Sequence, residues 1–279
     1  MSLTGEQLAA VERRSGPLSL SAAAGSGKTA VLVERFVAAV LQDGRSPSEI
    51  LAITFTERAA GELRERVRST FLELGERAAA RDTEAAYVST IHGFCARVLA
   101  AHPLAAGLDP GFRVLDDAVA GRLRQVAFQA ALGEFVRAED PAAVALVAAY
   151  GPDRLRPMVE SVHAQLRSRG RRIPRLPAPP PPREGQPQDA RASAACLLLD
   201  RLLAGFTDTY EALKSERAAV DFDDLELLAA QLLGTHEEIR RAWSERFELV
   251  MVDEFQDTNR SQLEILRLLE HEKLFTVGD

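Results

Sequence analysis

The sequence predicts an α/β fold in which a parallel sheet is flanked by helices and carries an inserted all-helical subdomain. Short apolar runs typical of buried strands alternate with segments of helical periodicity, the pattern of parallel strands joined by crossover helices. The predicted strands cover residues 17–22, 50–55, 86–90, 248–252 and 273–277. The long interval between the third and fourth strands is rich in Ala, Leu and Arg and shows helical periodicity at 116–136, 141–149, 153–168 and 189–216.

The domain organisation follows from that interval. We expect residues 1–100 and 217–279 to form one discontinuous domain and residues 101–216 to form the helical insertion. A proline-rich segment at 173–187 cannot continue a helix and should form an exposed extended loop. The arginines near its start fit two interpretations, contacts to nucleic-acid phosphates or a solvated helix end; they are Arg167, Arg169, Arg171, Arg172 and Arg175.

The first predicted strand leads into a segment with the features of a phosphate-binding loop. Residues 22–29 read Ala-Ala-Ala-Gly-Ser-Gly-Lys-Thr. The two glycines let successive N–H groups face an anion, Lys28 can neutralise the β and γ phosphates, and the Thr29 hydroxyl suits Mg²⁺. The helix that should follow directs its N-terminal partial charge at the phosphates. We expect the phosphates to lie among Ala24, Gly25, Ser26, Gly27, Lys28, Thr29 and Ala30.

Two adjacent carboxylates end the fourth predicted strand. Asp253 and Glu254 follow the apolar run Leu-Val-Met-Val at 249–252. Ligands of open parallel sheets bind beyond the carboxyl ends of the strands. Such a pair can hold a metal with one acid and polarise a water with the other. On its own the pair also fits a strand end with solvated acids, but together with the phosphate loop it indicates nucleotide chemistry.

These motifs and several further blocks, in a fixed order, resemble the UvrD/Rep family of superfamily 1 DNA helicases along nearly the whole chain. The blocks lie at 3–7, 22–29, 50–60, 88–94, 221–225, 252–258 and 277–279. In this family Ala is usual at the first position of the phosphate loop, where the strict pattern has Gly and this chain has Ala22. The sequence Thr-Phe-Thr-Glu at 54–57, the run at 106–116 and Ala30 are similar to the RecB/AddA nuclease-helicase branch.

The resemblance implies a RecA-like motor domain that uses ATP and Mg²⁺. It implies that Gln7 recognises adenine, that Lys28, Glu254 and Gln256 are the catalytic residues, and that Thr29 and Asp253 hold the metal. In this scheme Glu254 deprotonates the attacking water and Gln256 senses the γ-phosphate. The residues implied to lie along single-stranded DNA are Thr54, Phe55, Thr56, Thr90, His92, Gly93 and Phe94.

Residue type alone leaves other roles open for some of these positions. Phe55 suits a core position, and His92 suits a helix cap or a packing position. Trp243 should be a core or subdomain-interface residue. The aspartates Asp221, Asp223 and Asp224 fit the acidic first turn of a helix, with Asp221 as its N-cap, better than a metal cluster.

By the same resemblance, the function is translocation on single-stranded DNA and duplex unwinding driven by ATP hydrolysis, in repair or recombination. The implied partners are single-stranded DNA, junctions of single and double strands, and a nuclease or helicase subunit. Family members continue into a second RecA-like domain, whereas this sequence stops at Asp279. We therefore expect an N-terminal fragment that binds ATP, hydrolyses it slowly at most and does not unwind DNA. The alternatives are a non-catalytic ATP- or DNA-binding module and a motor subunit of a helicase–nuclease complex.

Composition agrees with a protein that works away from membranes. The chain has 279 residues, 46% hydrophobic, with a formal net charge of −7, so DNA would have to bind a local track rather than a generally basic surface. The two cysteines, Cys95 and Cys196, form no metal or disulfide pattern and should be buried free thiols. Because no signal peptide or apolar stretch of spanning length occurs, we expect a cytoplasmic protein without membrane contact.

Overall fold

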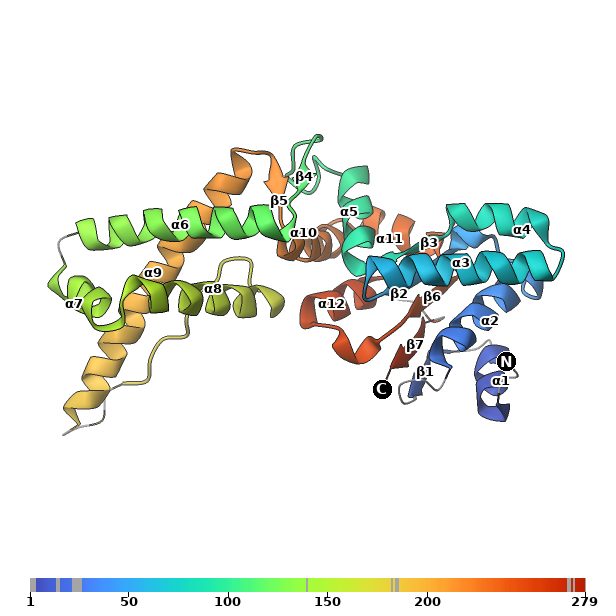
Figure 1. Ribbon diagram of the computed structural model, residues 1–279, viewed down its shortest axis with the longest axis horizontal. Helices are drawn as coiled ribbons and strands as arrows, with labels where there is room; N and C mark the ends of the chain where they lie inside the picture. The colour runs from blue at the N-terminus through green and yellow to red at the C-terminus, as the bar shows by residue number, and fades with distance from the viewer. Residues whose placement is uncertain are drawn as a thin grey trace. The chain divides into compact units, whose positions relative to one another are not determined.

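The computed structural model describes residues 4–13, 16–21, 27–138, 140–181, 183, 186–269, 272 and 274–278. The chain divides into two compact units, Met1–Ala106 with Leu228–Asp279, and Gly107–Leu227 (Figure 1). Sequence analysis places the boundaries near residues 100 and 216. The second boundary falls later because β4 (Arg113–Val114) pairs in parallel with β5 (Ala219–Val220), which keeps residues after 216 in the second unit.

The first unit contains a five-stranded parallel sheet, as the alternation of strand and helix patterns predicts. Its strand order is β1-β7-β6-β2-β3, and every neighbouring pair is parallel. All residues of β2 and β6 are buried, which explains why the sequence runs there are continuously apolar rather than alternating. The strands are β1 (Leu18–Ser21), β2 (Ile50–Thr54), β3 (Tyr87–Thr90), β6 (Leu249–Val252) and β7 (Leu274–Gly278).

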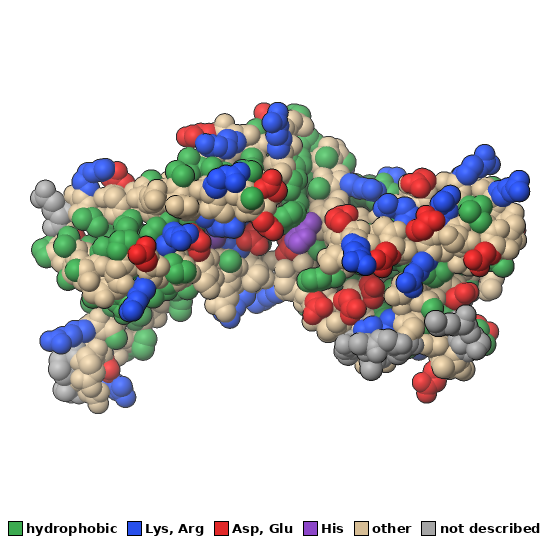
Figure 2. All heavy atoms as spheres, in the orientation of Figure 1, with side chains coloured by type: hydrophobic (Ala, Val, Ile, Leu, Met, Phe, Trp, Pro, Cys, Tyr) green, Lys and Arg blue, Asp and Glu red, His purple; other side chains and the backbone are tan. Residues whose placement is uncertain are grey.

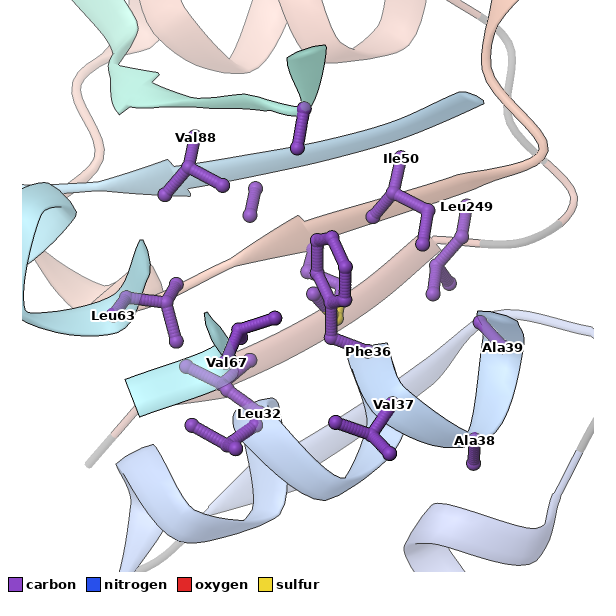
Figure 3. Close-up of a cluster of buried hydrophobic side chains, with 14 of the residues drawn as sticks. Leu32, Phe36, Val37, Ala38, Ala39, Ile50, Leu63, Val67, Val88 and Leu249 are labelled. Atoms are coloured by element: carbon purple, nitrogen blue, oxygen red, sulfur yellow. The ribbon is translucent and has the colours of Figure 1, made fainter. Parts of the chain in front are cut away.

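Helices flank this sheet and bury their apolar faces against it. Phe36 of α2 and Phe71 of α3 are fully buried and meet edge to face, with ring centroids 6.4 Å apart. Figure 3 shows the Phe36 ring of α2 pointing towards the strands that carry Ile50 and Leu249. The helices with residues in this unit are α1 (Gly5–Glu12), α2 (Lys28–Leu41), α3 (Glu57–Glu73), α4 (Arg77–Asp82), α5 (Ile91–Ala101), α10 (Phe222–Thr235), α11 (Glu237–Arg246) and α12 (Arg260–Leu268), with short 3₁₀ turns at η1 (Pro47–Glu49), η2 (Thr83–Ala85) and η3 (Phe255–Asp257).

The second unit is mostly helical, and its helices match the predicted periodicity. They are α6 (Asp117–Arg137), α7 (Pro141–Tyr150), α8 (Pro152–Ser168) and α9 (Pro187–Ser215). Their core contains the buried residues Phe128, Leu155, Leu202, Phe206 and Tyr210. The described residues between 174 and 181 form neither helix nor strand, as the prolines predict. Cys95 of the first unit is buried as predicted, but Cys196 lies on an exposed face of α9, so the prediction of two buried thiols is wrong for it.

A buried ion-pair cluster ties three helices of the second unit together. Its members are Arg167 from α8, Glu211 and Lys214 from α9, Asp221, and Asp224 from α10. Asp221 and Asp224 also cap each other, because each carboxylate accepts from the backbone N–H of the other, at 2.9 and 3.0 Å. This confirms Asp221 as the helix cap. Burial raises the pKa of Asp221, but the Lys214 ammonium and the Asp224 N–H outweigh it and lower that pKa to about 2.

Candidate nucleotide site and strand-end surface

Helix α2 begins at the site with a glycine cap and a positively charged side chain. Gly27, its N-cap residue, has a left-handed φ of 88°, and within the described part of the chain no side chain caps the first turn. The first N–H groups of a helix attract anions, so this end of α2 suits a phosphate. Lys28, Thr29 and Ala30 form that first turn. The predicted phosphate contacts at Ala24, Gly25 and Ser26 lie outside the described residues.

Gln7 lies beside the start of α2. A Cβ on Gly27 would be 3.3 Å from Gln7 Nε2, so the amide is in contact distance of the loop's last glycine. Gln7 also closes a capping box with Thr4: its Oε1 accepts from Thr4 N at 2.8 Å, and its own N–H donates to the Thr4 hydroxyl at 3.3 Å. The capping box fixes the start of α1, and this fixes where the Gln7 amide lies. Adenine recognition by Gln7 stays a prediction.

The structure brings the acidic end of β6 up to Lys28. Lys28 Nζ lies 3.3 Å from Glu254 Oε2, and the Gln256 amide donates to the same oxygen at 2.8 Å. The Lys28 side chain is only 10% exposed and that of Glu254 is 38% exposed. Glu254 adopts a left-handed φ of 49°, a conformation that costs free energy for a residue with a side chain and is concentrated at functional sites. Three predicted catalytic residues therefore meet at one point.

Asp253 has the electrostatics of a cation ligand. Burial raises the pKa of its carboxyl, and the neighbouring charge of Glu254 raises it further, while the Glu254 N–H and Lys28 lower it. A cation bound between these carboxylates would relieve that repulsion. Among the described residues, no three His, Cys, Asp or Glu side chains converge. Mg²⁺ fits this donor set, because it is usually held by one or two protein oxygens together with phosphates and water.

The carboxyl ends of β2 and β3 lie next to each other and carry the predicted DNA contacts. Thr54 pairs in register with Thr90 at the strand ends. The chain then leaves the sheet, and the Phe55 side chain is 61% exposed. Thr56 is exposed too, and its hydroxyl caps α3 by accepting from Ala59 N at 3.1 Å. Phe55 is thus not a core residue, and its ring is free to stack.

Thr54 and Thr90 are buried, and their hydroxyls bond inside the protein. The Thr54 hydroxyl donates to the Thr56 carbonyl at 3.1 Å, and that of Thr90 caps α5 by accepting from Gly93 N at 3.1 Å. Their side chains therefore shape the two loops. His92 and Gly93 are half-buried. Contact of these residues with DNA stays a prediction.

The prediction that Phe94 contacts DNA is wrong for its ring. Phe94 is fully buried and packs edge-on against Trp243 and Phe247, with ring centroids 5.7 and 6.1 Å away. It follows Ile91 by three positions in α5, so both residues share the helix face that packs inward. Trp243 is buried as predicted.

Charge on the second unit is less available to DNA than the arginine-rich sequence suggests. Arg167 is 2% exposed and pairs with Asp224, so it is no phosphate contact. Arg175 pairs with Asp200. Figure 2 shows basic and acidic side chains interspersed on the face in view.

In the described part of the chain, no helix has the length and apolarity needed to cross a membrane.

Comparison with known proteins identifies similar chains. Residues 3–279 match the family described as UvrD/REP helicase N-terminal domain. The chain is 31% identical over 279 residues to the ATP-dependent DNA helicase PcrA of Leuconostoc citreum and 28% identical over 276 residues to PcrA of Staphylococcus aureus. These alignments cover 99% and 98% of the chain but 32% of each relative, so the chain spans about a third of their length. It is also 38% identical to an ATP-dependent helicase/nuclease subunit of Alkaliphilus metalliredigens, over 53% of the chain and 13% of that protein.

Proposed function

Because this chain belongs to the UvrD/Rep helicase family, we propose that its first unit binds and hydrolyses ATP to drive movement along single-stranded DNA. The observation that carries the proposal is the meeting of Lys28, Glu254 and Gln256 at the carboxyl edge of the sheet, next to the start of α2. A cation from the start of α2 and an amide that follows β6 both lie within hydrogen-bonding distance of the Glu254 carboxylate.

In the proposed mechanism each residue has one task. Lys28 and the N–H groups of α2 hold the phosphates, and Thr29 and Asp253 would hold Mg²⁺. The metal would supply neutralisation of charge on the phosphate oxygens. Glu254 orients and deprotonates the attacking water, and Gln256 keeps Glu254 in place until the γ-phosphate draws the amide away. ATP must also break the contact between Lys28 and Glu254, which frees the carboxylate to act as a base.

The hydrolysis part of this proposal is tested by replacing Glu254 with glutamine. The amide keeps an oxygen that can accept from Lys28 and Gln256 but cannot take a proton from water. We expect nucleotide affinity within about threefold of the unsubstituted chain and turnover reduced by about a hundredfold or more, as loss of a general base requires. Equal loss of binding and turnover would instead assign Glu254 a structural or metal-binding role.

Single-stranded DNA is proposed to lie across the ends of β2 and β3, with a base on Phe55. Support comes from the exposed ring, since stacking on an aromatic side chain accepts any base. Phe55→Ala should weaken binding of a fluorescent single-stranded oligonucleotide by about tenfold. Leu72→Ala is the matched control, because Leu72 is also an exposed apolar residue, 46% exposed, in the last turn of α3. Equal affinities of the two variants would contradict the assignment.

Activities of the whole protein are proposed from its relatives. PcrA proteins are named as ATP-dependent DNA helicases, and this chain spans about a third of their length. We propose that unwinding and a role in repair belong to the whole protein, which acts in the cytoplasm, and that the 279 residues alone bind ATP without separating strands. Similarity to the helicase/nuclease relative supports a partner that carries nuclease activity. Strand displacement on a tailed duplex tests the first point, because robust displacement by this chain alone would contradict it.

A further inference from the structure

The two loops that follow β2 and β3 are joined by one side-chain contact. Thr90 Oγ1 donates to Glu57 Oε1 at 2.7 Å, although the residues are 33 positions apart in sequence. Glu57 is the first residue of α3 and directly follows the exposed pair Phe55 and Thr56. The contact therefore connects the end of the loop after β2 with the last residue of β3, where the other proposed DNA-binding loop begins.

The same carboxylate lies against the first turn of α5. A Cβ on Gly93 would be 3.6 Å from Glu57 Oε1, 3.4 Å from the Thr90 hydroxyl and 3.2 Å from Ser89 Cβ. The Thr90 hydroxyl accepts from Gly93 N while it donates to Glu57, so Gly93, Thr90 and Glu57 form a continuous hydrogen-bonded chain. A Cβ at position 93 would crowd the Ser89 side chain and lie in van der Waals contact with Glu57, so the first turn of α5, the end of β3 and the start of α3 are closely packed.

Sequence pattern alone gives Glu57 a smaller role. An acidic residue in the first turn of a helix is favoured by the helix dipole wherever the helix lies. On a surface that binds phosphates, however, a carboxylate repels the ligand and should lower its affinity. A negative charge at Glu57 should therefore lower the affinity for DNA unless the carboxylate contributes to binding through its contact with Thr90.

We propose that Glu57 is a positioning residue for single-stranded DNA, one that holds the loops after β2 and β3 at a fixed spacing through Thr90. The proposal rests on the DNA-binding function proposed above. Glu57 itself need not touch the nucleic acid: its hydrogen bond orders Phe55 and Thr56 relative to His92 and Gly93 before the strand arrives. Preordering of this kind raises affinity, because the bound conformation costs less entropy to reach.

The test uses variants that separate charge from contact. Glu57→Ala removes both the charge and the acceptor, whereas Glu57→Gln removes the charge but keeps an oxygen that can accept from Thr90. Glu62→Ala is the matched control. Glu62 is a second carboxylate of α3, 51% exposed, and it pairs with Arg58 rather than with the β3 loop.

Binding of a fluorescent single-stranded oligonucleotide is measured for each chain at two salt concentrations. We expect Glu57→Ala to weaken binding about threefold to tenfold, the contribution of one net hydrogen bond. Glu57→Gln and Glu62→Ala should bind as tightly as the unsubstituted chain or more tightly, with the gain larger at low salt, because each lacks one repulsive charge. If Glu57 acted only through the helix dipole, Glu57→Ala and Glu57→Gln would lower the affinity equally. Normal affinity of Glu57→Gln would therefore identify the hydrogen bond from Thr90 as the cause.

A double substitution gives an independent measure. If Glu57 acts through Thr90, adding Glu57→Ala to Thr90→Val should weaken binding no further, because the contact is already absent. Circular dichroism and thermal unfolding verify that every variant is folded. Equal affinities of Glu57→Ala and Glu62→Ala, or additive losses in the double variant, would overturn the role of Glu57 while leaving DNA binding intact. Failure of the unsubstituted chain to bind would overturn the DNA-binding proposal, and the role of Glu57 with it.

Discussion

Replacing Lys214 by methionine removes the ammonium at the centre of the ion-pair cluster in the second unit. The Lys214 side chain is fully buried, and its Nζ lies 2.9 Å from Glu211, 3.3 Å from Asp221, and closer still to Asp224. It also lies 4.6 Å from the centre of the Tyr210 ring. Methionine fills a similar volume without charge, so the substitution tests electrostatics rather than packing.

The expected loss of stability is about 3 kcal/mol at neutral pH. Removing one partner of a buried ion pair costs about 3–5 kcal/mol, because the remaining charge is left uncompensated. The lower end applies here, since Arg167 still pairs with Asp224. Asp221, in contrast, loses the ammonium that lowers its pKa, so burial should now raise the pKa of its carboxyl. A carboxyl with a raised pKa destabilises the fold above that pKa, so the loss should shrink as the pH is lowered from 7 towards 4.

Urea unfolding followed by far-ultraviolet circular dichroism measures this loss. Arg217→Met is the control, because Arg217 is an exposed cation just beyond the end of α9, and its loss should cost under about 0.5 kcal/mol. Adding Asp221→Asn to Lys214→Met should restore part of the stability, because the uncompensated charge is removed while an amide oxygen can still cap Asp224. A loss under about 1 kcal/mol, or one that does not change with pH, would refute the reasoning.

Two further predictions follow from the structure. Burial and the charge of Arg167 lower the pKa of His163 from its ordinary 6.5 to about 4, so the stability from keeping it neutral is complete above pH 6.5 and is lost as the pH falls towards 4. At pH 5 this loss is about 2 kcal/mol, and His163→Phe should abolish it. Burial raises the pKa of Asp223 to about 6, which changes stability with pH in the opposite direction, so the contribution of His163 is the difference in unfolding free energy between variant and parent at each pH. Identical pH profiles of the two chains would contradict this prediction. A Cβ at Gly278 would overlap the Gln256 amide oxygen and come within 3.3 Å of the Gln256 backbone nitrogen. Gly278→Ala should therefore displace Gln256 from Glu254 and lower ATP turnover about threefold to tenfold with little change in nucleotide affinity, whereas equal loss of affinity would show that the substitution disturbs the whole site.

The elements of the fold could be predicted because their signals are local. Continuously apolar runs at 50–53 and 249–252 indicated the buried central strands, and the helical repeat indicated α6 to α9. The spacing of the phosphate loop and the acidic strand end predicted which residues meet, although 226 positions separate Lys28 from Glu254. Lys28 opens the helix that follows β1 and Glu254 follows β6, and the topology of a parallel sheet brings the carboxyl ends of its strands to one edge.

The burial of some residues and the partners of others could not be predicted, because they depend on tertiary contacts that a local sequence pattern does not show. Lys214 and Arg167 are buried, whereas these residue types are almost always exposed unless paired. Arg167 pairs with Asp224, 57 positions away, and Lys214 pairs with Asp224 across the turn between α9 and α10. Phe94 lies within a block that the family resemblance assigns to DNA, but its position on the inner face of α5 depends on where that helix begins. Glu57 looks like an ordinary helix-start acid until Thr90 is seen beside it.

Calorimetric titration of ATP with Mg²⁺ into the chain and into its Lys28→Ala variant tests the central claim most directly. Both the phosphate-loop pattern and the contact with Glu254 identify Lys28 as part of the site. Arg45→Ala serves as control, because it also removes one cation from the first unit. Arg45 precedes β2 and pairs with Glu248, which precedes β6, at the opposite ends of these strands from the site. The account predicts binding by the parent chain and by Arg45→Ala, and no measurable heat with Lys28→Ala. Undiminished affinity of Lys28→Ala would contradict it.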